Sequence, residues 1–305
     1  METGAHPLGR VREFTLSAGG LRRLAVASAV MLVVIMASGA TVRLTGSGLG
    51  CEHWPGCAQH HFEPKSYHSY IEFGNRVVAF FTILATLAAW VGTRLARAPR
   101  SLRWLAFVMF LGTLLQAPLG AITIHYDLNP WLVLSHFLLS IVVLTFGVAL
   151  LIEALRLERG APPLRVSVWV RRWSLVVALS ACVLIISGTL TTASGKYPGS
   201  NGNDIVRRIF SFEGVIYWHV RATAVFGISF ALLLVWLVRN HSRHVRAALV
   251  VLAVLAVQMT VGEVQYRTDL PWWLVLIHVS LAATLWAVIV AFVYGLWRPV
   301  RSRMS

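Results

Sequence analysis

Charged residues are scarce in this chain of 305 residues. Asp, Glu, Lys and Arg together make up 13% of it, whereas hydrophobic residues reach 57%. Soluble domains carry about 25% charged residues, so this composition excludes an ordinary water-soluble domain. Several catalytic motifs are missing as well: the sequence has no Gly-rich phosphate loop, Walker motif, HExxH pattern or Ser-His-Asp order. The sequence therefore gives no indication of the enzyme classes that these motifs mark.

Long apolar runs fill most of the sequence. Eight of them are long enough to cross a bilayer core, for which a helix needs about 20 residues. They cover residues 22–42, 72–93, 103–123, 131–153, 170–191, 214–238, 246–265 and 272–297. Only helices and closed β-barrels can span a bilayer, and none of these runs shows the alternation of apolar and polar residues that is typical of a barrel strand. We predict an all-α integral membrane protein with eight transmembrane helices, arranged as two pseudo-symmetric four-helix bundles.

The two bundles are predicted from an internal repeat. Residues 116–136 match residues 258–278 without a gap, at nine of 21 positions, and each copy ends in a histidine. The chain then divides into a tail (1–21), a first four-helix repeat (22–153), a linker (154–169), a second repeat (170–297) and a C-terminal tail (298–305).

The formal net charge of +15 does not indicate a nucleic-acid partner. Most of the 27 lysines and arginines fall in the two tails and in the loops that share their side of the membrane. This asymmetry follows the positive-inside rule. We therefore expect a multi-pass protein of the cell membrane with both termini in the cytoplasm, and no nucleic-acid binding.

The first outer loop carries a cysteine pair, Cys51 and Cys57, on either side of a Pro-Gly turn. Outside the cytoplasm such a pair favours a disulfide. Two alternatives stay open: two free thiols, or a metal site that includes His53, His60 or His61.

The second helix begins with three polar residues on one face, because Glu72, Asn75 and Arg76 are spaced i, i+3 and i+4. A carboxylate and a guanidinium at the start of a spanning helix are costly unless they face the bundle interior. We expect this face to lie toward His136. The alternative is an ion pair that only anchors the helix at the membrane boundary.

Three histidines, His136, His219 and His278, lie in apolar helices at similar depth toward the outer face. An imidazole at this depth needs a partner, and haem iron held between two helices is a common one. We interpret His219 and His278 as axial ligands of a six-coordinate haem in the second repeat. Single packing histidines, or a transporter's proton relay, are the alternatives.

Taken together, these features resemble the haem A synthase family, the membrane enzymes that oxidise haem O to haem A for cytochrome oxidase. The resemblance is carried by the eight-helix duplication, the Cys51 and Cys57 pair, the Glu72-Phe73-Gly74-Asn75-Arg76 stretch and the histidines of helices four, six and eight. It implies an oxidoreductase that converts one porphyrin methyl group to a formyl group by two successive hydroxylations. It also implies haem O synthase and an electron acceptor as partners, and we consider a homo-oligomer.

The resemblance assigns roles residue by residue. His219 and His278 would hold a haem b cofactor, and His136 would bind the iron of the substrate, haem O. Glu72 matches the family's catalytic carboxylate, Arg76 would pair with Glu72 or with a haem propionate, and the two cysteines match a disulfide. Asn75 stands where the family usually has a second histidine, which predicts a substrate iron bound by His136 alone or with another donor.

Two other functions would also use buried histidines. A di-haem electron carrier would need paired histidines in both halves, and Asn75 counts against it. A transporter of haem or a small molecule would need helices broken in mid-membrane, whereas the polar groups here gather near the outer face.

Overall fold

A computed structural model describes residues 15–51, 53, 54, 56, 57, 64, 66–160, 166–200 and 209–297. Eight long helices account for nearly all of them: α1 (Ala18–Leu44), α2 (Tyr67–Leu95), α3 (Arg100–His125), α4 (Pro130–Arg159), α5 (Val168–Ser194), α6 (Phe212–Arg239), α7 (Val245–Arg267) and α8 (Trp272–Leu296). Each is long and apolar enough to cross a membrane. The predicted all-α, eight-span fold is confirmed.

Most of the helices are longer than the apolar runs that predicted them, and in several of them a polar capping residue lies beyond the run. Ser17 accepts a hydrogen bond from the Gly20 amide at 3.1 Å and starts α1 four residues before the expected boundary. At α2, Ser66 and Ser69 form a reciprocal capping box. Such caps satisfy the free N–H groups of a first helical turn.

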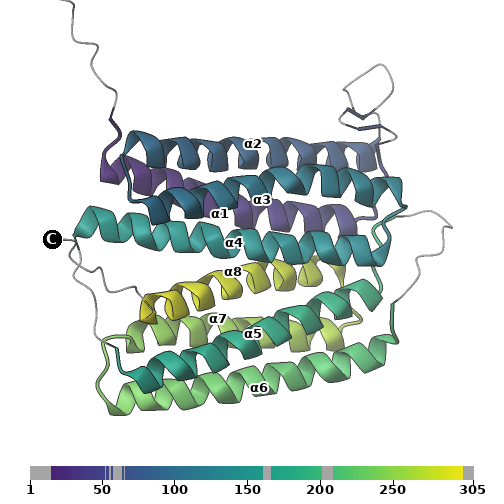
Figure 1. Cartoon of the computed structure of the whole chain (residues 1–305). Coiled ribbons are helices and arrows are strands. Elements are labelled where there is room, and N and C mark those ends of the chain that lie inside the picture. Colours follow the sequence, from purple (N-terminus) through teal and green to yellow (C-terminus); the bar gives the residue numbers. More distant parts are fainter. Residues whose placement is uncertain are drawn as a thin grey trace, which may run out of the picture.

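The helices form two four-helix units that lie side by side (Figure 1). In the first unit α1 packs against α2 and α4, and α3 packs against α2 and α4. The second unit repeats this ring with α5, α6, α7 and α8. The second and fourth helices of each ring are therefore diagonal partners, and among the described residues neither α2 with α4 nor α6 with α8 is in direct backbone contact.

The internal repeat is visible in the backbone as well as in the sequence. Asp127 and Leu128, before α4, have φ angles of 48° and 55°, and Asp269 and Leu270, before α8, have 61° and 56°. Two consecutive left-handed residues are unusual for non-glycine side chains. The same tight turn therefore delivers α4 and α8, each with its histidine, into its unit. The proposed division of the chain at residues 153 and 170 stays a prediction.

The two units share a continuous apolar core between α4, α8, α1 and α5. Within it, the indole nitrogen of Trp286 in α8 donates to the hydroxyl of Thr145 in α4 at 2.9 Å. On the outside, large apolar side chains stay exposed, including Leu179 at 67% and Ile228 at 63%. An exposed apolar belt on a helical bundle fits a lipid environment.

At the end of the bundle that carries the disulfide loop, the two units are joined by the segment that follows α5. Arg43, near the end of α1, donates to the backbone oxygens of Thr192 at 2.5 Å and Tyr197 at 2.9 Å. The Gly48 amide donates to the Gly199 oxygen at 2.7 Å, and the Tyr197 hydroxyl donates to the Leu270 oxygen at 2.6 Å. These hydrogen bonds form a seam between the units, which links the ends of α1 and α5 to the turn before α8.

Candidate functional site

A disulfide between Cys51 and Cys57 closes the loop at the start of α2. The predicted pairing is confirmed, and the alternative of free thiols is wrong. Both cysteines are buried, at 3% and 5% exposure. No cluster of three metal-ligating side chains occurs in the described part of the chain, which includes His53. The metal alternatives with His60 and His61 lie outside the described residues.

The disulfide loop covers Glu72, which is 3% exposed. One carboxylate oxygen of Glu72 accepts a hydrogen bond from the Cys51 amide at 2.8 Å. The other oxygen pairs with the guanidinium of Arg76, one helical turn further on, at 2.5 Å. Both oxygens of this buried carboxylate are therefore engaged, one by the loop and one by the helix.

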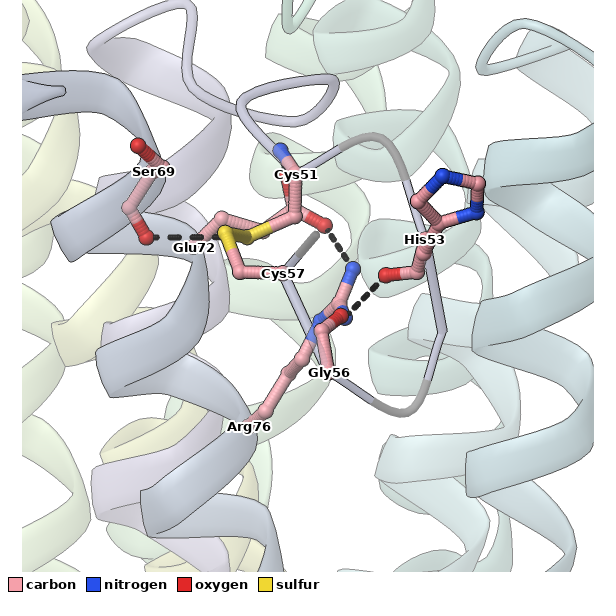
Figure 2. A network of polar contacts seen from close by, with 7 residues as sticks. All are labelled: Cys51, His53, Gly56, Cys57, Ser69, Glu72 and Arg76. Carbon is pink, nitrogen blue, oxygen red and sulfur yellow. Dashed lines mark hydrogen bonds and ion pairs between the residues drawn. A yellow bond between two sulfur atoms is a disulfide. The ribbon is translucent and has the colours of Figure 1, made fainter. Parts of the chain in front are cut away.

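Arg76 also ties the loop to the helix (Figure 2). Its Nη1 donates to the backbone oxygen of His53 at 2.7 Å and to that of Gly56. One guanidinium thus connects the carboxylate of Glu72 with two carbonyls of the disulfide loop. Of the two roles expected for Arg76, the structure shows the contact with Glu72.

Asn75 and His219 occupy equivalent places in the two units. Asn75 in α2 faces Gly39 in α1, where a Cβ atom would lie 3.9 Å from the amide oxygen. His219 in α6 faces Gly188 in α5, where a Cβ atom would lie 3.0 Å from the imidazole Cε1. The Ser187 hydroxyl is hydrogen-bonded to Nδ1 of His219 at 3.0 Å. Asn75 therefore stands where a first-unit counterpart of His219 would stand.

His278 in α8 is held by two residues of α7. The side-chain amide of Gln258 donates to the backbone oxygen of His278 at 3.1 Å and lies 3.2 Å from its Nε2. Gly262 lies under the ring, because a Cβ atom there would be 3.0 Å from Cε1. The imidazole therefore packs directly against helix backbone, and a larger residue at position 262 would displace it.

His136 in α4 has the same surroundings in the first unit. Gln116 of α3 donates to its backbone oxygen at 3.2 Å and to the Ser140 hydroxyl at 2.6 Å. Gly120 faces the ring, with a Cβ position 3.5 Å from Cε1. Each unit thus contains the same histidine frame, Gln116, Gly120 and His136 in the first and Gln258, Gly262 and His278 in the second. All six residues are matched by the internal repeat.

Several polar atoms in these frames are buried without a hydrogen-bond partner: Nδ1 of His136, Nδ1 of His278 and Oδ1 of Asn75. Leaving such atoms unsatisfied costs about 1–3 kcal/mol each, so a bound group is expected to compensate. His219 and His278 belong to α6 and α8, the diagonal partners of the second unit. Two imidazoles on opposite sides of one unit match the donor set of a six-coordinate haem.

The structure brings some of the predicted residues together and leaves others apart. Glu72 and Arg76 form one group with the disulfide, whereas among the described residues no hydrogen bond joins this group to His136 or Asn75. The sequence interpretation assigned no role to Gln116 or Gln258. The repeat could have indicated both, because each is identical between the copies and 20 residues before its histidine.

Comparison with known proteins places the chain in one family. The family model described as cytochrome oxidase assembly protein, COX15-CtaA, matches residues 22–69 and 61–290. A protein named "Heme A synthase" from Shouchella clausii is 27% identical over 259 residues, which cover 80% of this chain and 84% of the relative. Another of that name, from Symbiobacterium thermophilum, is 27% identical over 289 residues, covering 88% and 93%. The resemblance found in the sequence is confirmed, and the chain belongs to the COX15-CtaA family of cytochrome oxidase assembly proteins.

Proposed function

We propose that this protein is a haem A synthase, an oxidoreductase that converts the methyl group of haem O to a formyl group by successive hydroxylations. The proposal rests on family membership and on relatives of that name along most of the chain. The single structural observation that carries it is the histidine frame built once in each unit, in a protein whose first unit also holds a buried, tethered carboxylate. Eight unbroken helices also argue against a transporter with helices interrupted in mid-membrane.

In the second unit, His219 and His278 would hold haem b as the resident cofactor. Ser187 fixes the orientation of the His219 ring, and Gln258 fixes the backbone and ring of His278. Such outer contacts set the direction in which a ligating imidazole points. When bound, haem b supplies an iron centre that can accept and pass on single electrons.

In the first unit, His136 would bind the iron of the substrate haem O. Asn75 takes the place of a second imidazole there, and an amide is a poor ligand for haem iron. The buried amide oxygen of Asn75 and the glycine opposite it leave room for a group other than a protein side chain. We therefore expect a substrate iron with one protein imidazole.

Glu72 would act as the catalytic carboxylate. A buried carboxylate can take up a proton or stabilise positive charge that develops at the substrate methyl carbon. Arg76 and the Cys51 amide hold Glu72 in one position, so its oxygen is presented in a fixed direction. Arg76 is then a positioning residue: it acts through Glu72 and through the loop above it.

The charge distribution supports insertion in the cell membrane with both termini in the cytoplasm, and the disulfide would then lie on the outer side. Substrate would then come from a haem O synthase, and electrons would leave to an acceptor in or beside the membrane. A homo-oligomer remains part of this proposal.

The function can be tested by co-expression with a source of haem O in a host that makes no haem A. Acid extraction of the pigments followed by chromatography should yield haem A or its hydroxylated precursor. A protein that bound haem but returned only haem b and unchanged haem O would be an electron carrier, and the proposal would be wrong.

A further inference from the structure

A groove of about 340 Å³ lies between α2 and α3. It lies where α2 ends and α3 begins, and the start of α2 with its disulfide loop is at the opposite end of the bundle (Figure 1). Its lining residues are Trp90, Arg94, Arg100, Arg103, Trp104 and Phe107. It is distant from the histidine frames, which lie near the other ends of their helices. We propose that this groove binds an anionic phospholipid, with the phosphate among the arginines and the apolar part against the aromatic rings.

The positive charge of the groove lacks an internal counter-charge. Among the described residues, no carboxylate forms an ion pair with Arg94, Arg100 or Arg103. Other arginines at the same end of the bundle are neutralised, because Arg22 pairs with Glu158 at 2.8 Å and Arg156 pairs with Glu153 at 2.6 Å. Three unneutralised guanidinium groups from two helices form a site for an anion.

The backbone adds to this preference. Helix α3 begins at Arg100, and its N-cap residue, Pro99, provides no side-chain hydrogen bond. The first N–H groups and the positive end of the helix dipole therefore lie beside the same arginines. An anion at this position would be attracted by the side chains and the helix end together.

The walls of the groove suit the apolar part of a lipid better than a small free anion. Trp90 stacks on Phe110 with ring centroids 5.4 Å apart, and Arg94 lies over the Trp90 ring at 5.3 Å. Trp104 meets Phe107 edge-on at 5.6 Å and is 53% exposed. Tryptophan and arginine together are typical of the bilayer boundary, and basic pockets between helices on the cytoplasmic side bind lipid head groups.

The second unit offers a matched control. Three arginines lie at the same end of the bundle: Arg239 at the end of α6, Arg243 in the α6–α7 connection and Arg246 at the start of α7. The repeat aligns Arg246 with Trp104 and Leu249 with Phe107, so the aromatic wall is not reproduced there. A double substitution of Arg243 and Arg246 removes as much charge from this face as one of Arg100 and Arg103.

The test is lipid binding by the full-length protein, measured by native mass spectrometry in a neutral detergent. Phosphatidylglycerol and phosphatidylcholine are added separately to wild type, to Arg100→Gln/Arg103→Gln and to Arg243→Gln/Arg246→Gln. We expect wild type to prefer phosphatidylglycerol, and the first variant to bind it roughly 25-fold more weakly, since each of the two arginines contributes roughly fivefold to anionic lipid binding. The second variant should bind as wild type does.

Three outcomes would overturn the proposal. The first is equal binding of both lipids by wild type, and the second is equal weakening in both double variants, which would mean that only net charge matters. The third is displacement of phosphatidylglycerol by millimolar inorganic phosphate, which would indicate a free-anion site. The Arg100→Lys/Arg103→Lys variant keeps the charge and should retain most of the binding, which separates lost affinity from lost folding. None of these readouts depends on haem chemistry, so they are independent of the proposed function.

Discussion

Asn75 faces Gly39 across the α1–α2 contact just as His219 faces Gly188 across the α5–α6 contact. Both units therefore have the glycine, but only the second unit has a histidine that faces it. A glycine opposite a ring lets an imidazole lie against the helix backbone, so the first unit still has the space for one.

Asn75→His should provide a second imidazole in the first unit. We expect protein loaded with haem O to change from a high-spin spectrum to a low-spin spectrum, because two imidazoles give a strong ligand field. Electronic absorption and electron paramagnetic resonance would detect this change. Asn75→Gln is the control and should leave the spin state unchanged; a low-spin wild type would contradict the single-imidazole expectation.

Glu72→Gln should lower the yield of haem A by at least about a hundredfold, the scale typical of a lost acid–base or electrostatic group. Glu153→Gln is a matched control, because Glu153 is also a buried glutamate paired with an arginine on its own helix. It lies at the other end of the bundle and should retain activity. Pigment extraction measures both, and equal losses in the two variants would mean that Glu72 acts only through folding.

Gly188→Ala should weaken haem binding in the second unit. The new methyl group would lie 3.0 Å from Cε1 of His219, too close for the ring to keep its position. We expect a lower haem content per protein and a smaller low-spin fraction in the absorption spectrum. Gly227→Ala, in α6, meets no atom within 4 Å and should keep full haem content, with a gain in stability of up to about 1 kcal/mol. Similar haem loss in both variants would count against His219 as a ligand.

The Cys51→Ser/Cys57→Ser variant should be less stable by about 2 kcal/mol, the scale expected for closing a short loop. It should also lose about 10- to 100-fold in activity, because the carbonyls that hold Arg76 would no longer be fixed above Glu72. Thermal denaturation and pigment extraction measure the two effects. Cys182→Ser, outside the loop, is the control. A stability loss without an activity loss would show that the loop does not position Glu72.

Much of the fold followed from the sequence because bilayer physics leaves few choices. The eight apolar runs predicted the eight helices, and the internal repeat predicted the two units. The spacing of Glu72 and Arg76 placed them one helical turn apart, where they form an ion pair. The helix ends were harder to predict. Capping residues such as Ser17 and Ser66 extend helices beyond the apolar part, where hydropathy carries no signal.

The parts that could not be predicted depend on contacts distant in sequence. Nothing near Arg76 in the chain indicates that the carbonyls of His53 and Gly56 will be its acceptors. The same holds for Arg43, whose acceptors lie about 150 residues away. Backbone acceptors leave no residue-type signature, so such bonds become visible only once the helices are in place.

The seam between the units bears on whether the two halves of the chain can be separated. Arg43 belongs to the first unit, yet both of its acceptors belong to the second, and Tyr197 in turn reaches the turn that delivers α8. If the polypeptide were cut between α4 and α5, the two fragments would have to associate before these hydrogen bonds could form. The hydrogen bonds that join the two copies of the bundle therefore lie at the end that carries the disulfide, and we expect the two halves to be less stable apart than together.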